Sequence, residues 1–549
     1  MKKIFINSAT CCSLLASCCL LISCSDFDDY NSLPVISEES ANKTIMEVID
    51  NSGNMQDFSR LLKLSGVEET LRGATDITVW APLDGTYDAQ SMIGEEGSVI
   101  LKQFIKNHIS FYSHSLKEGE TQRIRTLNGK SYDFSTEKFG QQQIRELNIP
   151  CSNGFLHTIN GRQRFYPNVY EYIMNSADDI DSVRTYFSKF ETTYLDTENS
   201  IPGPMVGGKQ TYIDSVMVTT NTLFSRFRAY ISREDSSYLA LLPTDKSWNG
   251  IYNRIKPYYN YVAKTAAQEY DANTGNATTK FCNIRQEAFK DSLIRYSIMS
   301  KIFFNTNDYW NRWAIGRPDA ETRDTLYSTT RELLTNGLEM LSQSIQTDTM
   351  SNGIVQKVDS MALMRSTWAP DLRLLAASGT YRAKCSGAAA SSVSMAIEDM
   401  NLSKVPLMED TLTSYVDIVP TSNYSKPDII YYLPNVLSAN YEIIAVIMPA
   451  DIRRGYDGDV KPNKFSATIS YSDANGTLKT KTLGKAYVND TSKVDYLSLG
   501  TMKFPVAYRG LGSYYPTIEI QSTVGTSKAE KEAFDREIRL AAIIMKPID

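Results

Sequence analysis

The sequence has little histidine, with only 3 among 549 residues, at positions 108, 114 and 157. It contains no histidine pair at zinc-site spacing, no Gly-x-Ser-x-Gly elbow and no Gly-rich phosphate-binding loop. These absences exclude the usual signatures of zinc hydrolases, serine hydrolases and nucleotide-binding enzymes, so we expect no catalytic residue, no metal and no cofactor. A glycosidase-type carboxylate pair stays open as an alternative, because 63 acidic residues allow two to meet from distant segments.

Cysteine is scarce beyond residue 24. Five of the 8 cysteines lie at positions 11–24, which leaves Cys151, Cys282 and Cys385 in the rest of the chain. Their spacing indicates neither a disulfide framework nor a metal site, and we interpret them as buried thiols whose pairing stays open. A net positive charge is also lacking. The formal net charge is −6, which excludes the basic footprint of a nucleic-acid-binding protein.

The first 24 residues have the pattern of an export signal. Lys2 and Lys3 precede an apolar stretch, and the small residue Ser23 stands directly before Cys24. This arrangement resembles a bacterial lipoprotein signal peptide at residues 1–23, which implies cleavage before Cys24 and acylation of that cysteine. Two or more acyl chains anchor a protein to a membrane durably. An uncleaved anchor helix is the alternative, but the serines and threonines of the apolar stretch make it a weak membrane span.

An acidic segment follows the predicted lipidation site. Residues 25–29, Ser-Asp-Phe-Asp-Asp, resemble the signal that carries lipoproteins to the outer face of the outer membrane in some Gram-negative bacteria. The resemblance implies a lipid-anchored protein on the outer membrane that faces the cell exterior. Residues 24–42 are polar and lack an apolar period, so we interpret them as the lipidated cysteine and a flexible stalk.

Two strand-and-turn segments frame the first folded region. The apolar run 77–81 ends at Pro82, which cannot donate to a strand ladder, and Asp84 begins a turn. Farther on, Asn153-Gly154 forms a tight turn before a strand with alternating polarity that ends at Asn160. A stretch with helical spacing between them ends at Asn107-His108-Ile109.

These three pieces, in this order, resemble the two signatures and the central histidine of fasciclin domains. The resemblance implies a fasciclin-like domain 1 over residues 43–172 and a role in cell adhesion. We expect its motif residues to be structural: Pro82, Asp84, His108, Asn153, Gly154 and His157. Asn160 departs from the family, which usually has an aspartate there.

A divergent second copy follows, which indicates an internal repeat. Residues 238–245 repeat the first signature with Pro243 and Asp245, and residues 351–359 repeat the second with Asn352, Gly353 and Asp359. We predict a fasciclin-like domain 2 over 178–368, with an insertion near 252–282. In this copy we expect Lys301 at the position of His108 and Gln356 at that of His157.

Aromatic clusters in the second copy are candidates for ligand binding. Tyr309, Trp310 and Trp313 follow its helix, and the insertion contains Tyr258, Tyr259, Tyr261 and Tyr270. Exposed aromatic faces beside amide and guanidinium groups suit sugar rings or partner proteins. The alternative is that both clusters pack into the core of the repeat, where aromatic residues usually lie.

The last part of the chain changes in character. We interpret residues 369–425, rich in small side chains, as a linker or transition. From residue 426 to 549, alternating and apolar runs predict strands of a β-sandwich. Tyr508, Tyr514 and Tyr515 lie in a Gly-broken segment between two of these strands and are further candidates for ligand binding, with packing against the sandwich edge as the alternative.

Together, these patterns predict an α+β protein with two tandem fasciclin-like domains, each of mixed helices and β-sandwich-like sheets, followed by an all-β sandwich or jelly-roll domain. We interpret it as a surface lipoprotein that binds without catalysis, either in adhesion or as an accessory of a glycan or peptide uptake system. Its expected partners are membrane lipid and a polysaccharide or peptide ligand. One alternative is a docking subunit for an outer-membrane transporter or other surface lipoproteins. The other is a glycoside hydrolase-like enzyme.

Overall fold

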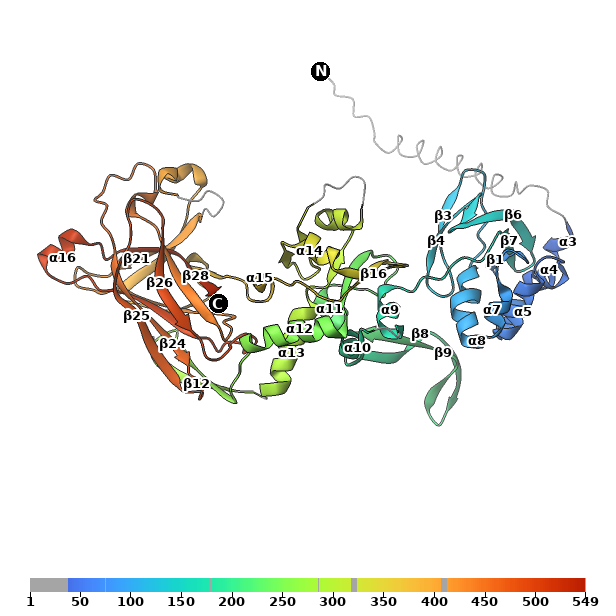
Figure 1. The fold of residues 1–549 in the computed structure, drawn as a ribbon, viewed down its shortest axis with the longest axis horizontal. Helices are drawn as coiled ribbons and strands as arrows, with labels where there is room; N and C mark the ends of the chain where they lie inside the picture. Colours follow the sequence, from blue (N-terminus) through green and yellow to red (C-terminus); the bar gives the residue numbers. More distant parts are fainter. Residues whose placement is uncertain are drawn as a thin grey trace, which may run out of the picture. The chain divides into compact units, whose positions relative to one another are not determined.

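The computed structural model describes residues 38–74, 76–176, 179–284, 286–316, 323–405 and 412–548 (Figure 1). The predicted signal peptide, Cys24 and most of the predicted stalk lie outside these residues. The chain divides into two compact units, Met1–Asn168 and Val169–Asp549. No helix in the described ranges is long and apolar enough to cross a membrane.

The first unit is built on a seven-stranded sheet in the order β2-β1-β7-β6-β5-β4-β3. β1 and β7 are parallel, and β1 is buried along its whole length, as expected for a strand covered on both faces. The strands are β1 (Ile77–Pro82), β2 (Ile109–Phe111), β3 (Thr121–Arg125), β4 (Ser131–Ser135), β5 (Lys138–Phe139), β6 (Gln142–Cys151) and β7 (Gly154–Ile159).

The two faces of β1 pack against different partners. Val79 lies in one buried cluster with Phe58 and other helical side chains, whereas Trp80 lies in a second cluster and stacks on Phe139 at 4.3 Å between ring centroids. Alternation along the strand therefore joins a helical layer to a smaller aromatic core. The helices are α3 (Glu38–Ala41), α4 (Ile45–Asn51), α5 (Gln56–Leu64), α6 (Glu68–Gly73), α7 (Ala89–Ile93) and α8 (Gly97–Val99), followed by the helical turns η1 (Ile100–Phe104) and η2 (Ile105–His108).

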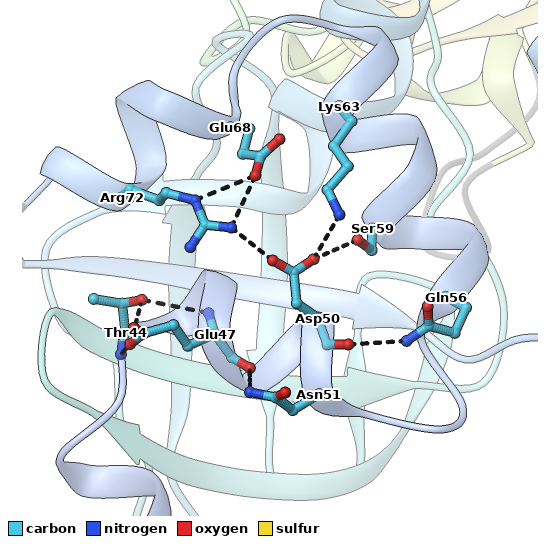
Figure 2. Close-up of polar contacts among 9 residues, drawn as sticks. All are labelled: Thr44, Glu47, Asp50, Asn51, Gln56, Ser59, Lys63, Glu68 and Arg72. Atoms are coloured by element: carbon cyan, nitrogen blue, oxygen red, sulfur yellow. Dashed lines mark hydrogen bonds and ion pairs between the residues drawn. The ribbon is translucent and has the colours of Figure 1, made fainter.

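A polar network holds helices α4, α5 and α6 of this unit together (Figure 2). Thr44 and Glu47 form a capping box that begins α4, in which the Thr44 N–H donates to the Glu47 carboxylate at 2.7 Å. Asp50, in the last turn of α4, accepts hydrogen bonds from side chains of α5 and α6. The donors are Ser59 at 2.6 Å, Lys63 at 3.0 Å and Arg72 at 2.7 Å.

The second unit begins with a smaller version of the same core. A four-stranded sheet has the order β13-β10-β17-β16, in which β10 and β17 are parallel, as β1 and β7 are. Its strands are β10 (Tyr238–Pro243), β13 (Phe303–Asn305), β16 (Ser344–Met350) and β17 (Gly353–Val358). Its helices are α9 (Val169–Asn175), α10 (Asp181–Ser188), α11 (Leu223–Phe227), α12 (Asp245–Ile255), α13 (Gln286–Met299), α14 (Gly337–Ser342) and α15 (Arg365–Trp368).

Three hairpins are added to this second core. The long hairpin of β8 (Glu191–Val206) and β9 (Lys209–Asn221) is drawn in Figure 1 as a two-stranded ribbon and is not expected from the sequence pattern. β14 (Leu326–Tyr327) and β15 (Leu333–Leu334) form a short one. β11 (Lys264–Tyr270) and β12 (Ala277–Asn283) form the third, which lies within the predicted insertion.

Two antiparallel sheets form the C-terminal sandwich. One contains β20-β21-β28-β23-β26, with β18 also paired to β28, and the other has the order β19-β22-β27-β24-β25. The strands are β18 (Leu372–Leu375), β19 (Arg382–Ser386), β20 (Ala388–Ser394), β21 (Ser414–Pro420), β22 (Asp428–Tyr432), β23 (Asn440–Ile447), β24 (Lys464–Ser472), β25 (Leu478–Val488), β26 (Asp495–Lys503), β27 (Thr517–Ser522) and β28 (Ile538–Ile548), with α16 (Lys528–Ala533) before the last.

The sandwich therefore includes strands from the segment that we predicted to be a linker or transition, residues 369–425. β18 to β21 all lie in this segment and pair with later strands or with each other. The sequence of β20 shows no alternation of apolar and polar residues, because β20 is an edge strand that buries little of its own surface.

Candidate functional site

The two signature strands pair in the same register in both repeats. Ile77 lies opposite Gly154 in the first repeat, and Tyr238 lies opposite Gly353 in the second. A Cβ atom on either glycine would overlap the carbonyl oxygen of the residue opposite, and both glycines have positive φ, at 142° and 150°. The motif glycines are therefore required by close backbone contact.

The asparagine before each glycine joins the start of the repeat to its sheet. Asn153 accepts a hydrogen bond from the Ile45 N–H at 2.9 Å and donates to the Leu71 carbonyl at 3.0 Å. Asn352 accepts from the Val169 N–H at 2.9 Å and donates to the Ile231 carbonyl at 2.8 Å. Both side chains satisfy buried backbone groups, so their role in the structure is architectural.

The motif aspartates bind helix N-termini. Asp84 accepts from the Gln56 and Asp57 N–H groups at 2.8 and 2.9 Å, at the start of α5. Asp245 accepts from the N–H groups of residues 181 and 182 at 3.1 and 2.7 Å, at the start of α10. A carboxylate at a helix N-terminus is stabilising because it pairs free N–H groups and faces the positive end of the dipole.

The motif histidines are buried and hydrogen-bonded within the protein. His108 contacts the Phe104 carbonyl at 2.7 Å through Nδ1 and accepts from the Gln163 N–H at 2.9 Å through Nε2. His157 accepts from the Asn148 N–H at 3.0 Å through Nδ1 and contacts a backbone carbonyl at 2.9 Å through Nε2. Burial lowers the pKa of both imidazoles to about 4, so both are neutral at physiological pH. Neither has a nitrogen left to bind a ligand.

The strand register moves Lys301 from the position we predicted. Val79 pairs with Ile109 in the first repeat, and the equivalent Ala240 pairs with Phe303 in the second. Counting back from these pairs places Ile302, not Lys301, at the position of the histidine. Lys301 instead occupies the position of Asn107.

The two residues at this shared position are both buried and both form polar contacts. Asn107 accepts hydrogen bonds from Asn128 at 2.9 Å and from Tyr132 at 2.8 Å. Buried Lys301 forms an ion pair with Glu332 at 2.7 Å. Gln356 does lie at the position of His157, since each pairs with the fourth residue of its signature strand.

Of the first aromatic cluster, two side chains are exposed. Tyr309 is 60% exposed and Trp310 is 49% exposed, with their rings edge-to-face at 5.9 Å. The Arg323 guanidinium lies over both rings, at 5.0 and 4.8 Å from their centroids, and donates to the Tyr309 hydroxyl at 3.1 Å. We call these three residues the aromatic corner. Trp313 is only 8% exposed and donates to the Thr325 carbonyl, so it is a core residue.

The three C-terminal candidates are buried or half-buried, which favours the packing alternative. Tyr508 is only 1% exposed, and its hydroxyl accepts a hydrogen bond from the Ser472 N–H, which removes it from any ligand surface. Tyr514 packs partly against the core. Tyr515 is half-buried and contacts Tyr381 and Tyr432, with ring centroids 6.0 and 6.1 Å apart.

Tyr381 also lines a cavity of about 350 Å³ in the sandwich, together with apolar side chains that include Leu433 and Ile543. Asp371 and Arg373 supply charges of both signs to its lining. Neither this cavity nor the role of Arg323 in the aromatic corner was predicted from the sequence. No local motif marks either one, since both depend on segments that meet only after folding.

One carboxylate pair, of buried Asp428 and half-buried Glu519, bears on the hydrolase alternative. The pKa of Glu519 is raised, chiefly by burial and then by the adjacent carboxylate of Asp428. The two carboxyl groups interact electrostatically, and Asp428 also accepts a hydrogen bond from the Ser386 hydroxyl at 3.0 Å. A glycosidase would instead hold its two carboxyl groups roughly 5 Å or more apart, on either side of the glycosidic bond. Within the described ranges, no group of three or more His, Cys, Asp or Glu side chains is arranged to hold a metal ion.

Comparison with known proteins bears on the first repeat. The family model described as Fasciclin domain matches residues 53–161. The structure is similar to a FAS1 domain pair from the insect cell adhesion molecule fasciclin I, at 12% identity and a TM-score of 0.20, over 58% of this chain and 99% of that one. It is also similar to the enzymatically active domain of bacteriophage CBA120 tailspike protein 4, at 9% identity and a TM-score of 0.17, over 32% of this chain and 19% of that one. Curated protein sequences give no match.

The matched residues contain both signature strands of the first unit, β1 and β7, and the buried His108 that precedes β2. The shared geometry of the second repeat follows from its own strand register and does not depend on the match. The chain therefore contains a domain of the fasciclin family, at residues 53–161.

Proposed function

We propose that this protein is a non-catalytic binding or adhesion protein displayed on the outer membrane by a lipid at Cys24. A fasciclin domain fits such a role, and its motif residues here are engaged in structural hydrogen bonds. In this proposal the fasciclin-like repeats and the sandwich present binding surfaces for a polysaccharide or peptide, as an accessory of an uptake system.

The aromatic corner is the observation that carries this proposal. Tyr309 and Trp310 expose about half of their surface in a region where most aromatic side chains are buried, and exposed rings suit the apolar faces of sugars. Arg323 holds the two rings and adds hydrogen-bond donors beside them. An exposed aromatic pair fixed by a cation is suited to ligand contact without rearrangement.

Glycan binding by the full chain in mild detergent tests this role. We expect saturable binding to at least one member of a broad polysaccharide panel, and a loss of about tenfold or more in Tyr309→Ala/Trp310→Ala. The matched control is Tyr424→Ala/Tyr456→Ala, which removes two other exposed tyrosines. Equal losses in both variants, or no binding by the parent protein, would contradict the proposal.

The lipid anchor is tested separately. We expect Cys24→Ser to move the protein from the membrane fraction to the soluble fraction, because no acyl chain is attached. Protease treatment of intact cells should degrade the parent protein if it faces the exterior. Protection from protease would overturn the proposed orientation, and membrane retention of Cys24→Ser would overturn the anchor.

A second candidate function is docking to a protein partner, which the β8–β9 hairpin favours. A two-stranded ribbon is marginally stable in water without further packing. Met205 and Val206, next to its turn, are 67% and 63% exposed. Replacing both with serine should reduce co-purification of partner proteins from native membranes if docking is the function.

A further inference from the structure

A groove of about 470 Å³ lies within the Val169–Asp549 unit, where the insertion of the second repeat meets the sandwich. Three lysines line it, and they come from distant parts of the sequence. Lys256 follows α12, Lys290 lies on α13, and Lys503 ends β26. The rest of the lining is uncharged: Asn253, Pro257, Asn260, Ser438, Phe504 and Pro505. We call this the lysine groove.

Hydrogen bonds between the insertion and the sandwich, across what we call the seam, fix the positions of these segments. The Asn260 side chain donates to the Pro505 carbonyl at 2.8 Å, and the Ser438 hydroxyl donates to the Pro257 carbonyl at 2.8 Å. The Ala507 N–H donates to the Asn260 carbonyl at 2.7 Å. The backbone beside Lys256 and Lys503 is therefore held in place before any ligand arrives, which lowers the ordering cost of binding.

The charge in the lysine groove is not balanced by the protein. No carboxylate is among its lining residues, and none of the described acidic groups forms an ion pair with Lys256, Lys290 or Lys503. Asp291, the neighbour of Lys290, is bound to Arg295 at 2.8 Å and to the Tyr252 hydroxyl at 3.1 Å. Glu287 lies one turn before Lys290 on α13.

This local charge contrasts with the whole chain, whose formal net charge is −6. A cleft lined by charges of one sign concentrates its field and attracts ligands of the opposite sign. Three lysines that line one groove without an ion-pair partner repel one another, and an anionic ligand would relieve that repulsion.

The lining indicates what kind of anion fits. Each lysine ammonium group acts as a separate point charge, whereas the planar guanidinium group of arginine binds one phosphate or carboxylate through two hydrogen bonds. Asn253 and Asn260 add amide groups that suit hydroxyls, and the two proline rings offer apolar contact surface. We infer that the lysine groove binds an acidic polysaccharide through carboxylate or sulfate groups repeated along the chain. This inference rests on the proposed function and names a ligand class for it.

Binding of defined polymers to the full chain in mild detergent tests the inference. The probes are polygalacturonate for carboxylate, dextran sulfate for sulfate, and neutral dextran. We expect one or both polyanions to bind saturably, neutral dextran not to bind, and binding to weaken as salt is raised, because screening acts on exposed charges. Lys256→Gln/Lys290→Gln/Lys503→Gln should weaken polyanion binding about tenfold, as three modest ionic contacts are lost.

The matched control makes the same change in charge elsewhere. Lys138→Gln/Lys426→Gln/Lys528→Gln replaces three exposed lysines outside the groove and should retain full polyanion binding. An equal loss in both variants would overturn the inference, since it would reflect net charge alone. Binding that is lost in Tyr309→Ala/Trp310→Ala but kept in the groove variant would overturn it and leave the proposed function standing. No binding to any glycan would contradict both.

Discussion

At the scale of single residues, Asp50 shows how one carboxylate organises the helical layer of the first unit. Burial alone would raise its pKa, but hydrogen bonds from Ser59, Lys63 and Arg72 outweigh burial and lower it (Figure 2). Because the pKa is lower in the folded protein, the ionised group contributes stability at neutral pH. That contribution is lost as the pH falls through the folded pKa.

We predict that Asp50→Asn lowers the free energy of local opening of α4 to α6 at pH 7 by about 1 to 2 kcal/mol, since charge-assisted hydrogen bonds become neutral ones. Hydrogen–deuterium exchange of peptides covering residues 45–72 in the full chain measures this. Asp133→Asn is the control, because Asp133 pairs only with Arg123 and both are well exposed. Unchanged exchange in the Asp50 variant would contradict the role of the network.

Glu519 has the opposite pH dependence. Its pKa is raised by burial and by Asp428, while Lys384 opposes the rise, and Tyr270 of the insertion hairpin also faces it. A carboxyl group with a raised folded pKa binds more protons in the folded state than in the unfolded state. Stability therefore falls as the pH rises from the ordinary carboxyl range through the raised pKa.

We predict that the sandwich of the parent protein melts at a lower temperature at pH 8 than at pH 5, and that Glu519→Gln reduces this difference. If Glu519→Gln removes about 1 kcal/mol of this loss of stability, the difference in melting temperature between the two pH values falls by roughly 2 °C in a unit of this size. Differential scanning calorimetry of the full chain provides the measurement. The control Glu532→Gln changes an exposed carboxylate and should leave the pH dependence intact.

At the scale of elements, the two parallel signature pairs are the most constrained parts of the repeats. We predict that Gly154→Ala and Gly353→Ala each destabilise their own repeat by about 3 kcal/mol or more, since the new methyl group must displace the strand opposite. Urea unfolding followed by limited proteolysis reports which repeat opens. Gly94→Ala is the control, with negative φ and open space around its Cβ position. A mild effect at both motif positions would mean that the strands can separate locally.

These elements could be predicted from sequence because each constraint demands one residue type at one position. Gly154 must lack a Cβ atom, Asn153 must bond buried backbone groups and Asp84 must bind a helix N-terminus, so the same residue types recur in the second repeat. The predicted position of Lys301 is wrong by one residue, because the apolar spacing of its helix does not fix where the following strand begins. The β8–β9 hairpin could not be predicted, since its strands contain Pro202 and several register shifts that break the alternating pattern.

The candidate ligand residues were harder to predict. Trp313 and Tyr508 look the same in sequence as the exposed Trp310 and the half-buried Tyr515, because burial depends on which distant segment covers a ring. The lysine groove could not be predicted at all, since its three lysines are far apart in the sequence and meet only across a seam.

At the scale of the whole Val169–Asp549 unit, the insertion joins the second repeat to the sandwich. The sequence left open whether its tyrosines bind ligand or pack. Tyr259 and Tyr261 are buried, and the Ala266 N–H on β11 donates to Ser472 of β24 at 3.3 Å. Tyr259 and Tyr261 therefore serve packing between two folded parts, and one continuous buried cluster runs through both.

Arg509 of the sandwich lies at this contact between the sandwich and the insertion. Its guanidinium donates to the Tyr259 hydroxyl at 3.3 Å and to the Trp368 carbonyl at 3.1 Å, and its own carbonyl accepts from the Tyr261 hydroxyl at 2.7 Å. It thus contacts the insertion and the end of the second repeat at once. Its removal leaves buried partners without a hydrogen bond, which is costly.

We predict that residues 169–549 unfold in one calorimetric transition in the parent protein, and that Arg509→Ala splits this transition in two or makes the insertion sensitive to protease first. Coupled parts unfold together only while the contacts between them outweigh the difference in their own stabilities. Arg145→Ala, an exposed arginine of the first unit, should change neither result. A single transition in Arg509→Ala, with unchanged cleavage of the insertion, would show that the apolar cluster couples the two parts without this arginine.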